Sequence, residues 1–233
     1  MAARSGRPVA PERMEALVLA KTVEQAGGRD EAVAKPKAPQ RRRGVKRVEA
    51  LLAAAEQVFA EVGYGAASMN AIAQRAGAPI GSLYQFFPNK AVLGGALVER
   101  YAIDLIETWQ AACAPVRPGD WAGFADVLLD ATLDCIIRHA AFGTLDEAQV
   151  QFQLHPGSHQ EFEVALAALL AAKAGDAPEA DVKVVAIVAL QILKSAYALE
   201  RGGGGSEIKR EMALIMRSYF EAKLGSGGGM PPK

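Results

Sequence analysis

The stretch SMNAIAQRAGAPIGSLYQFFPNK, from Ser68 to Lys90, sets the fold class of this chain. Ser68 suits a helix N-cap, and apolar residues recur at helical spacing after it. The tripeptide Gly77-Ala78-Pro79 breaks that helix, and a second short helix is predicted from Ile80 to Phe87. Two short helices joined by a tight, glycine-bearing turn are typical of a helix-turn-helix, whose second helix lies in the major groove of DNA.

The second of these helices has an apolar side and a small or polar side. Leu83 and Phe87 lie four residues apart, so we expect both to pack into a core with Phe59 and Ile72. The opposite side must then face the bases. The residues expected there are Ile80, Gly81, Ser82, Tyr84 and Gln85.

Each residue on that outer side suits a contact with DNA. Gly81 has no Cβ and permits a close approach to the duplex. Gln85 can bond an adenine edge with two hydrogen bonds, and Ile80 can pack on a thymine methyl group. Ser82 can bond a base or a phosphate, and the Tyr84 hydroxyl can reach a phosphate.

Polar and basic residues beside the motif complete the predicted DNA contacts. Asn89 is expected to cap the next helix. The backbone amide groups at the start of that helix and the Lys90 ammonium should then face a phosphate. The first helix is predicted from about Val45 to Val62. The basic residues ahead of it, Arg41–Arg43 and Lys46, are expected to enter the minor groove of the DNA or to bind its phosphates. The remaining predicted DNA-contacting residues are Arg41, Arg42, Arg43, Lys46 and Ser68.

Residues from about Arg43 to Val98 resemble the DNA-binding domain of the TetR family of bacterial transcriptional regulators. The matching residues are Ser68, Ile72-Ala73, Ala76-Gly77, Gly81-Ser82-Leu83-Tyr84, Phe86-Phe87 and Lys90. Two positions depart from the family pattern: Ala71 replaces an acidic capping-box residue, and Pro79 replaces a serine cap. The resemblance implies a repressor that binds a palindromic operator as a homodimer, with a ligand-binding and dimerisation domain after about residue 89.

Charge is distributed unevenly along a chain whose net charge is zero. Residues 41–90 carry seven Lys or Arg against three Glu, a net charge of +4, and the remainder therefore carries −4. A basic module joined to an acidic one fits a phosphate-binding domain with a separate second task, although a solvated charge run explains the same count.

The rest of the chain is predicted to be all-α. Helices are expected over about 89–113, 119–140, 144–154, 158–174, 178–200 and 206–224, with breaks at Gly and Pro. The predicted domains are a tail at 1–40, a helix-turn-helix domain at 41–88, a helical effector and dimerisation domain at 89–224, and a tail at 225–233.

The last two predicted helices carry apolar stripes that could close a four-helix bundle between two subunits. Both stripes could instead belong to the core of one chain. The predicted interface residues are Val182, Val185, Ala189, Leu193, Ala196, Ile208, Met212, Ile215 and Tyr219. Aromatic residues are expected to line an effector pocket, unless they are ordinary core: Trp109, Trp121, Phe124, Phe142 and Phe152.

Other function classes find little support in the sequence. We expect no cofactor and no metal, because neither Cys113 nor Cys135 belongs to a CxxC pair or lies near a His at ligand spacing. In addition, Pro156-Gly157 separates two of the histidines. No nucleophile elbow or phosphate loop indicates an enzyme. Lysines interrupt the apolar run near 182–199, so we expect a cytoplasmic protein with no membrane partner. A regulator that binds DNA without any effector remains the alternative function.

Overall fold

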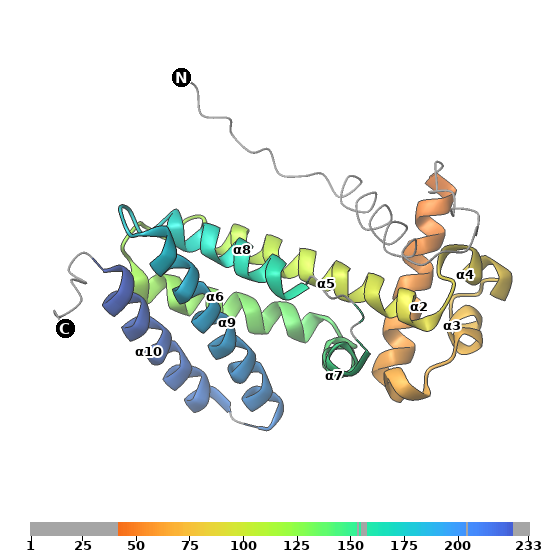
Figure 1. The fold of residues 1–233 in the computed structure, drawn as a ribbon. Helices are drawn as coiled ribbons and strands as arrows, with labels where there is room; N and C mark the ends of the chain where they lie inside the picture. Colours follow the sequence, from red (N-terminus) through yellow and green to blue (C-terminus); the bar gives the residue numbers. More distant parts are fainter. Residues whose placement is uncertain (1–41, 153, 155–157, 204, 226–233) are drawn as a thin grey trace, which may run out of the picture. The chain divides into compact units, whose positions relative to one another are not determined.

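The structure is a computed structural model, and it describes residues 42–152, 154, 158–203 and 205–225. Within these ranges every regular element is a helix (Figure 1), which confirms the all-α prediction. The helices are α2 (Arg42–Ala66), α3 (Met69–Arg75), α4 (Ile80–Phe86), α5 (Lys90–Cys113), α6 (Trp121–Arg138), α7 (Phe142–Phe152), α8 (Ser158–Ala171), α9 (Glu179–Arg201) and α10 (Gly205–Leu224). From α5 onward the observed ends lie within three residues of the predicted ones.

The chain forms two compact units, and α5 contributes to both. The first unit holds α2, α3, α4, the part of α5 up to Arg100, and α7. The second unit holds α5 from Tyr101 onward together with α6, α8, α9 and α10. This division differs from the predicted domain boundary at 88/89, because α7 packs on α2 although it lies some eighty residues later in the chain.

The first unit is built around the core that the apolar spacing predicts. Phe59, Ile72 and Leu83 are completely buried, and Phe87 is 1% exposed. α3 packs against both α2 and α4, so these residues from three helices meet in one place. Burying a side chain of this size stabilises a fold by about 1.5–3 kcal/mol. The short helices α3 and α4 therefore owe their stability to this core more than to their own length.

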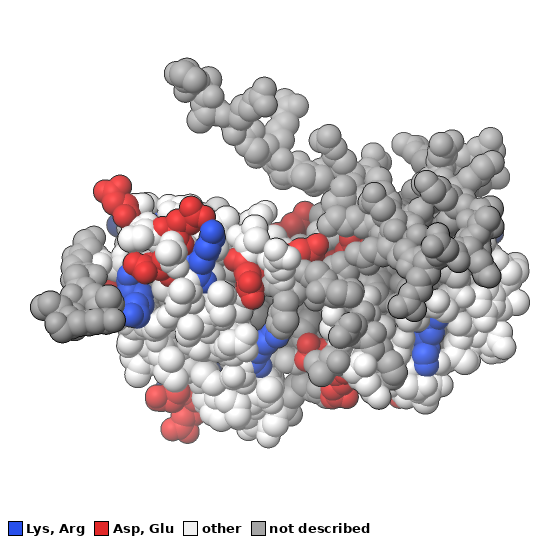
Figure 2. Space-filling view, viewed as in Figure 1, with Lys and Arg blue, Asp and Glu red and all other residues white. Residues whose placement is uncertain are grey.

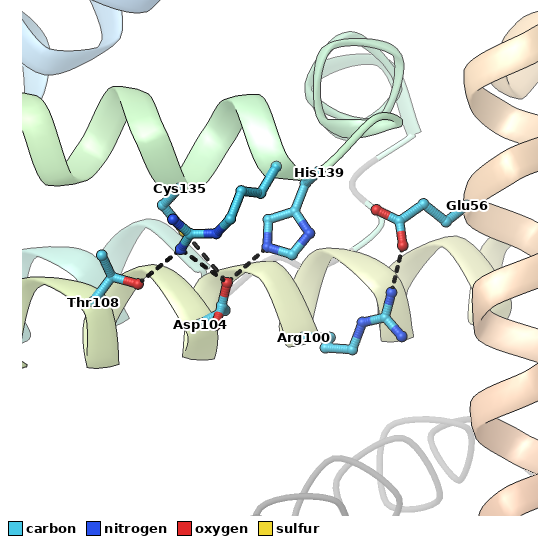
Figure 3. Close-up of polar contacts among 7 residues, drawn as sticks. Glu56, Arg100, Asp104, Thr108, Cys135 and His139 are labelled. Carbon is cyan, nitrogen blue, oxygen red and sulfur yellow. Dashed lines mark hydrogen bonds and ion pairs between the residues drawn. The ribbon is translucent and has the colours of Figure 1, made fainter.

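α2 is interrupted at Gly63, whose φ of 77° and ψ of 159° are not helical. The conformation favours glycine, and the break lies directly after Val62, where this helix was predicted to end. The Tyr64 amide after the break donates a hydrogen bond to Thr144 Oγ1 at 3.0 Å, which ties α7 to the end of α2. α2 is also joined to α5, because Arg100 Nη2 donates to Glu56 Oε2 at 2.8 Å (Figure 3).

At Gly95, another segment of the first unit comes very close to the backbone of α5. A Cβ added at this glycine would lie 2.5 Å from the Leu154 carbonyl oxygen, which is too close for any larger residue. Leu154 follows α7 and is itself buried. Gly95 thus allows the chain after α7 to pack directly on α5.

The second unit has its own core, formed between α6, α9 and α10 with α8 packed on α9. Trp121, Phe124 and Phe220 form an aromatic cluster in it, with ring centroids 5.8–6.1 Å apart. Trp109 lies in the same core, where its indole Nε1 donates to Thr132 Oγ1 at 2.8 Å. Ion pairs join the rim of α10 to α6, between Arg217 and Asp126 and between Lys209 and Asp130.

α9 is long and apolar enough to cross a membrane by length and composition alone over Glu179–Leu199. Such a segment is also what a core helix of a water-soluble fold looks like, and α9 packs against α8 and α10. Its buried side faces the core of the second unit.

Candidate DNA-binding surface and partner surfaces

α4 separates its buried and exposed side chains as predicted for a recognition helix. Leu83 is fully buried on the inner side, whereas Ile80 and Tyr84 on the outer side are 38% and 49% exposed. Gly81 and Gln85 are exposed as well, and Ser82 is half-buried. A Cβ at Gly81 would meet nothing within 4 Å, so the outer side is open beside this residue. The five residues expected at the DNA therefore share one accessible side of α4.

Three local signals that set the motif are confirmed. The Ala71 amide donates to Ser68 Oγ at 3.1 Å, so Ser68 is the N-cap of α3. The Val92 amide donates to Asn89 Oδ1 at 2.9 Å, which caps α5 in the same way. α4 begins directly after Pro79, which fits the expectation that proline at this point does not prevent the helix.

Arg47 is a candidate DNA-contacting residue that the sequence reasoning missed. This exposed arginine of α2 donates from Nη1 to Ser82 Oγ at 3.2 Å, which places a guanidinium at the edge of the outer side of α4. Its position one helical turn after Arg43 could have indicated it, because residues four apart share a helix face. Arginine at such an edge is well suited to bind a phosphate.

Lys90 has a different role from the predicted phosphate contact. Its ammonium donates to the carbonyl oxygens of Tyr64, Gly65 and Ala67 at 2.7–2.9 Å, so all three donors are used. The ammonium also lies 4.8 Å from the centre of the Tyr64 ring. The lysine therefore binds the carbonyl groups at the end of α2, after the break at Gly63. These hydrogen bonds disfavour the predicted contact of Lys90 with a DNA phosphate, which stays a prediction.

Arg75 does not add free positive charge to this unit. Its guanidinium forms two hydrogen bonds with the Glu61 carboxylate, at 2.6 and 2.7 Å. The Arg75 hydrogen bond lowers the pKa of Glu61, and the same bond raises the pKa of Arg75. Arg75 and Glu61 therefore cancel each other within the net charge of +4 counted along residues 41–90, and other cations carry the excess, among them the exposed Lys46.

The basic group ahead of the motif is only partly described. Arg41 lies outside the described residues, and so do the side chains of Arg42 and Arg43. The backbone of α2 begins at Arg42, so Lys46 lies inside this helix and not ahead of it as predicted. Their contact with DNA stays a prediction.

The predicted dimer stripe on α9 lies in the core of its own chain. The five side chains are at most 4% exposed, and they pack with α6, α8 and α10. They are not available to a partner, and the prediction is corrected for Val182, Val185, Ala189, Leu193 and Ala196. The stripe on α10 is partly accessible: Ile215 is 50% exposed, and Ile208, Met212 and Tyr219 are half-buried.

A second apolar side of α9 and α10 remains exposed in the single chain. Val184 and Ile187 of α9 are 56% and 43% exposed, and Leu214 of α10 is 53% exposed. We call this surface the α9–α10 face, formed by the large apolar side chains Val184, Ile187, Leu199, Leu214 and Ile215. These side chains are large and apolar, yet the described residues of the chain leave them exposed to solvent.

The five aromatic residues predicted to line a pocket do not lie together in one unit. Trp109, Trp121 and Phe124 are buried in the core of the second unit. Phe142 belongs to α7 of the first unit and is half-buried, and the side chain of Phe152 is outside the described part of the chain. Trp121 and Phe124 pack against Phe220, which makes them core residues. A role in binding an effector stays a prediction for all five.

The chain matches two family models, one in each half. Residues 51–97 match the model of the bacterial regulatory proteins of the tetR family. Residues 120–219 match the model of the tetracyclin repressor-like C-terminal domain. The first match contains α3, α4 and Lys90, and the second extends from the start of α6 into α10.

Solved structures with the same fold extend over most of the chain. A TetR-family transcriptional regulator from Streptomyces coelicolor is 28% identical, covers 76% of this chain and 99% of its own length, and has a TM-score of 0.63. A putative transcriptional regulator from Pseudomonas aeruginosa is 17% identical over 78% of this chain and 91% of its own, also with a TM-score of 0.63. A SmeT–triclosan complex is 18% identical over 81% of this chain and 96% of its own, with a TM-score of 0.60.

Proposed function

The chain belongs to the tetR family of bacterial regulatory proteins, and on that premise we propose that it represses transcription as a homodimer. In this proposal the dimer binds a palindromic operator and releases it when a small molecule binds the second unit. A regulator that binds DNA and has no effector is the alternative. The two proposals share the DNA-binding surface and differ only in what the second unit does.

The outer side of α4 is the observation that carries the proposal. Gly81, Tyr84 and Gln85 are exposed on a helix whose opposite side is fully buried. The side chains are small or polar, and they suit the edges of bases and the phosphates beside them. Arg47 adds a charged donor at the rim of this side, where a phosphate would lie. This arrangement supports insertion of α4 into the major groove.

The α9–α10 face supports the homodimer. Two copies of this face can meet about a two-fold axis, because the same patch on each subunit is then self-complementary. A lipid partner is disfavoured, since the exposed Lys183 and Lys194 lie within the apolar stretch of α9. A dimer also places two α4 helices at one operator, which a palindrome requires.

Release by an effector is supported by the second unit and by the course of α5. A solved structure of the same fold holds triclosan, and by analogy we place a small-molecule site in the second unit here. α5 is one continuous helix that belongs to the first unit up to Arg100 and to the second unit thereafter. A ligand that binds one conformation of the second half of α5 more tightly raises the population of that conformation. Because the helix is continuous, we expect the first half of α5 to change with it.

Selection of tight-binding duplexes from a random DNA pool tests the DNA-binding part. The expected product is a palindrome with half-sites one helical turn apart, roughly 34 Å, or a multiple of it. Gln85→Ala should still bind DNA but lose about 1–3 kcal/mol of preference at one base pair in each half-site. Gln110→Ala, at an exposed glutamine of the second unit, is the control and should select the wild-type sequence. Selected sequences without symmetry would contradict the proposal.

A thermal-shift screen of small molecules on the full chain separates the two alternatives. A sensor must be stabilised by its ligand, by RT ln(1 + [L]/Kd), and the same compound must weaken binding to the selected operator. If a compound raises the melting temperature and leaves operator affinity unchanged, the release mechanism fails. If no compound stabilises the chain, the regulator without an effector is favoured.

A further inference from the structure

Three side chains with metal-binding chemistry converge between α5 and α6 in the second unit (Figure 3). Asp104 lies on α5, Cys135 lies in the last turn of α6, and His139 follows directly after α6. Their donor atoms, a carboxylate oxygen, a sulfur and an imidazole nitrogen, all lie within 4.8 Å of one another. None of these residues belongs to the DNA-binding surface or to the α9–α10 face.

One oxygen atom holds the cluster together. His139 Nε2 lies 2.9 Å from Asp104 Oδ2, and Cys135 Sγ donates to the same oxygen at 3.5 Å. Tetrahedral ligands at ordinary zinc bond lengths lie about 3.3–3.7 Å apart, so small side-chain shifts would bring all three atoms onto one ion. The Tyr101 ring is stacked on the His139 imidazole with centroids 4.0 Å apart, which fixes the orientation of the imidazole.

We propose that Asp104, Cys135 and His139 form a zinc site that joins α5 to α6. A thiolate, an imidazole and a carboxylate together suit Zn²⁺, whereas the sulfur ligand disfavours Mg²⁺ and Ca²⁺. On binding, the Cys135 thiol loses its proton to solvent and the neutral imidazole binds through Nε2, with its proton on Nδ1. Three protein ligands leave a fourth position for water.

The proposed site differs from the expectation, drawn from the sequence, that the chain binds no metal. Cys135 and His139 are four residues apart, a spacing that brings the two side chains near each other at the end of α6. That spacing is the available signal, and the statement that neither cysteine lies near a histidine at ligand spacing overlooks it. Asp104 gave no signal, because it lies thirty-one residues before Cys135 and only the packing of α5 on α6 brings them together.

Arg138 provides a test in which a substitution should strengthen metal binding and not weaken it. Its Nη2 lies 3.7 Å from Asp104 Oδ2 and donates to Thr108 Oγ1 at 3.3 Å, so a positive charge sits beside the proposed ion. Its side chain is 54% exposed and can turn away into solvent. Removing this charge should strengthen metal binding, whereas a purely structural role for the cluster predicts no such gain.

The experiment titrates Co²⁺ into the full chain after chelator treatment and then displaces it with Zn²⁺. The wild type should bind one Co²⁺ per chain, with a thiolate-to-cobalt charge-transfer band in the near ultraviolet that Zn²⁺ abolishes. Cys135→Ser should lose the band, and Asp104→Asn should weaken Zn²⁺ binding by at least about 100-fold. Arg138→Gln should bind several-fold more tightly than the wild type.

Cys113→Ser is the matched control. Cys113 is a buried cysteine of the same unit, and burial raises the pKa of its thiol to about 11. It should show the wild-type band, and circular dichroism reports whether each variant keeps its helices. Asp104→Asn keeps the test valid if Cys135→Ser fails to fold, because the Asp104 side chain is 43% exposed. A wild type without the band, a band that survives in Asp104→Asn at wild-type affinity, or no tightening in Arg138→Gln would each overturn the proposal.

Discussion

The outer side of α4 and the α9–α10 face are both exposed surfaces on helices whose other sides are buried, yet their chemistry is opposite. Apart from Ile80, the outer side of α4 presents residues that are small or able to form hydrogen bonds, namely Gly81, Ser82, Tyr84 and Gln85. The α9–α10 face presents branched apolar side chains such as Ile187 and Ile215. A hydrated, charged partner suits the first surface and another apolar protein surface suits the second. The side-chain chemistry of each surface therefore indicates the kind of partner that it suits.

The largest effect is expected from placing charge on the α9–α10 face. Ile187→Glu combined with Ile215→Glu should give a monomer, because a buried carboxylate without a partner strongly opposes association. A monomer contacts only one half-site, so operator affinity should fall on the order of 1,000-fold. Sedimentation measures the oligomeric state, and fluorescence anisotropy measures the affinity.

Val164→Glu is the control for this double variant. Val164 of α8 is 64% exposed but lies outside the α9–α10 face. It should remain a dimer with wild-type affinity for the operator. A double variant that still sediments as a dimer would show that the subunits meet through another surface.

Lys90 sharpens the comparison. It lies close to α4 in the sequence, but its positive charge does not belong to the outer side of α4. Lys90→Met removes three hydrogen bonds to carbonyl oxygens at the end of α2. The free energy of unfolding should fall by about 2–3 kcal/mol, the cost of leaving such acceptors without their charged donor. Denaturant titration measures the loss. In the folded Lys90→Met variant, the slope of log DNA affinity against log salt concentration should equal that of the wild type. A smaller slope would show that Lys90 contacts a phosphate.

A smaller effect separates two arginines of the first unit. Arg47→Gln should weaken binding a few-fold for every DNA sequence and reduce the salt slope by about 1, as expected for one lost phosphate contact. Arg75→Gln is the matched control, because Glu61 already holds that guanidinium through two hydrogen bonds. Its salt slope should not change. Equal slopes for the two variants would remove Arg47 from the DNA-binding surface.

The helix-turn-helix was predictable because its signals are local. Ser68 and Asn89 cap the helices that follow them, and Gly63 interrupts the helix before them. Each residue acts on a backbone at most a few positions away, so spacing along the chain is enough to recognise it. Leu83 was placed in the core by the same reasoning, since a short helix has only one side to bury.

The roles of Lys90 and of the α9 stripe could not be predicted in this way. Lys90 binds carbonyl groups more than twenty residues earlier, which only the packing of α5 against the end of α2 brings near. α9 is apolar on two sides, and spacing identifies apolar sides without saying which is covered by the same chain. The stripe through Val185 and Ala189 is the inner one, and the stripe through Val184 and Ile187 is the outer one.

Photo-crosslinking from α4 to the selected operator tests the central claim most directly. A photoreactive side chain placed at Gln85 should crosslink to bases at two symmetric positions, one in each half-site, while the same group at Val164 should give no crosslink. If Gln85 gives no crosslink to a duplex that the variant still binds, α4 is not the recognition helix and this account of DNA binding is wrong.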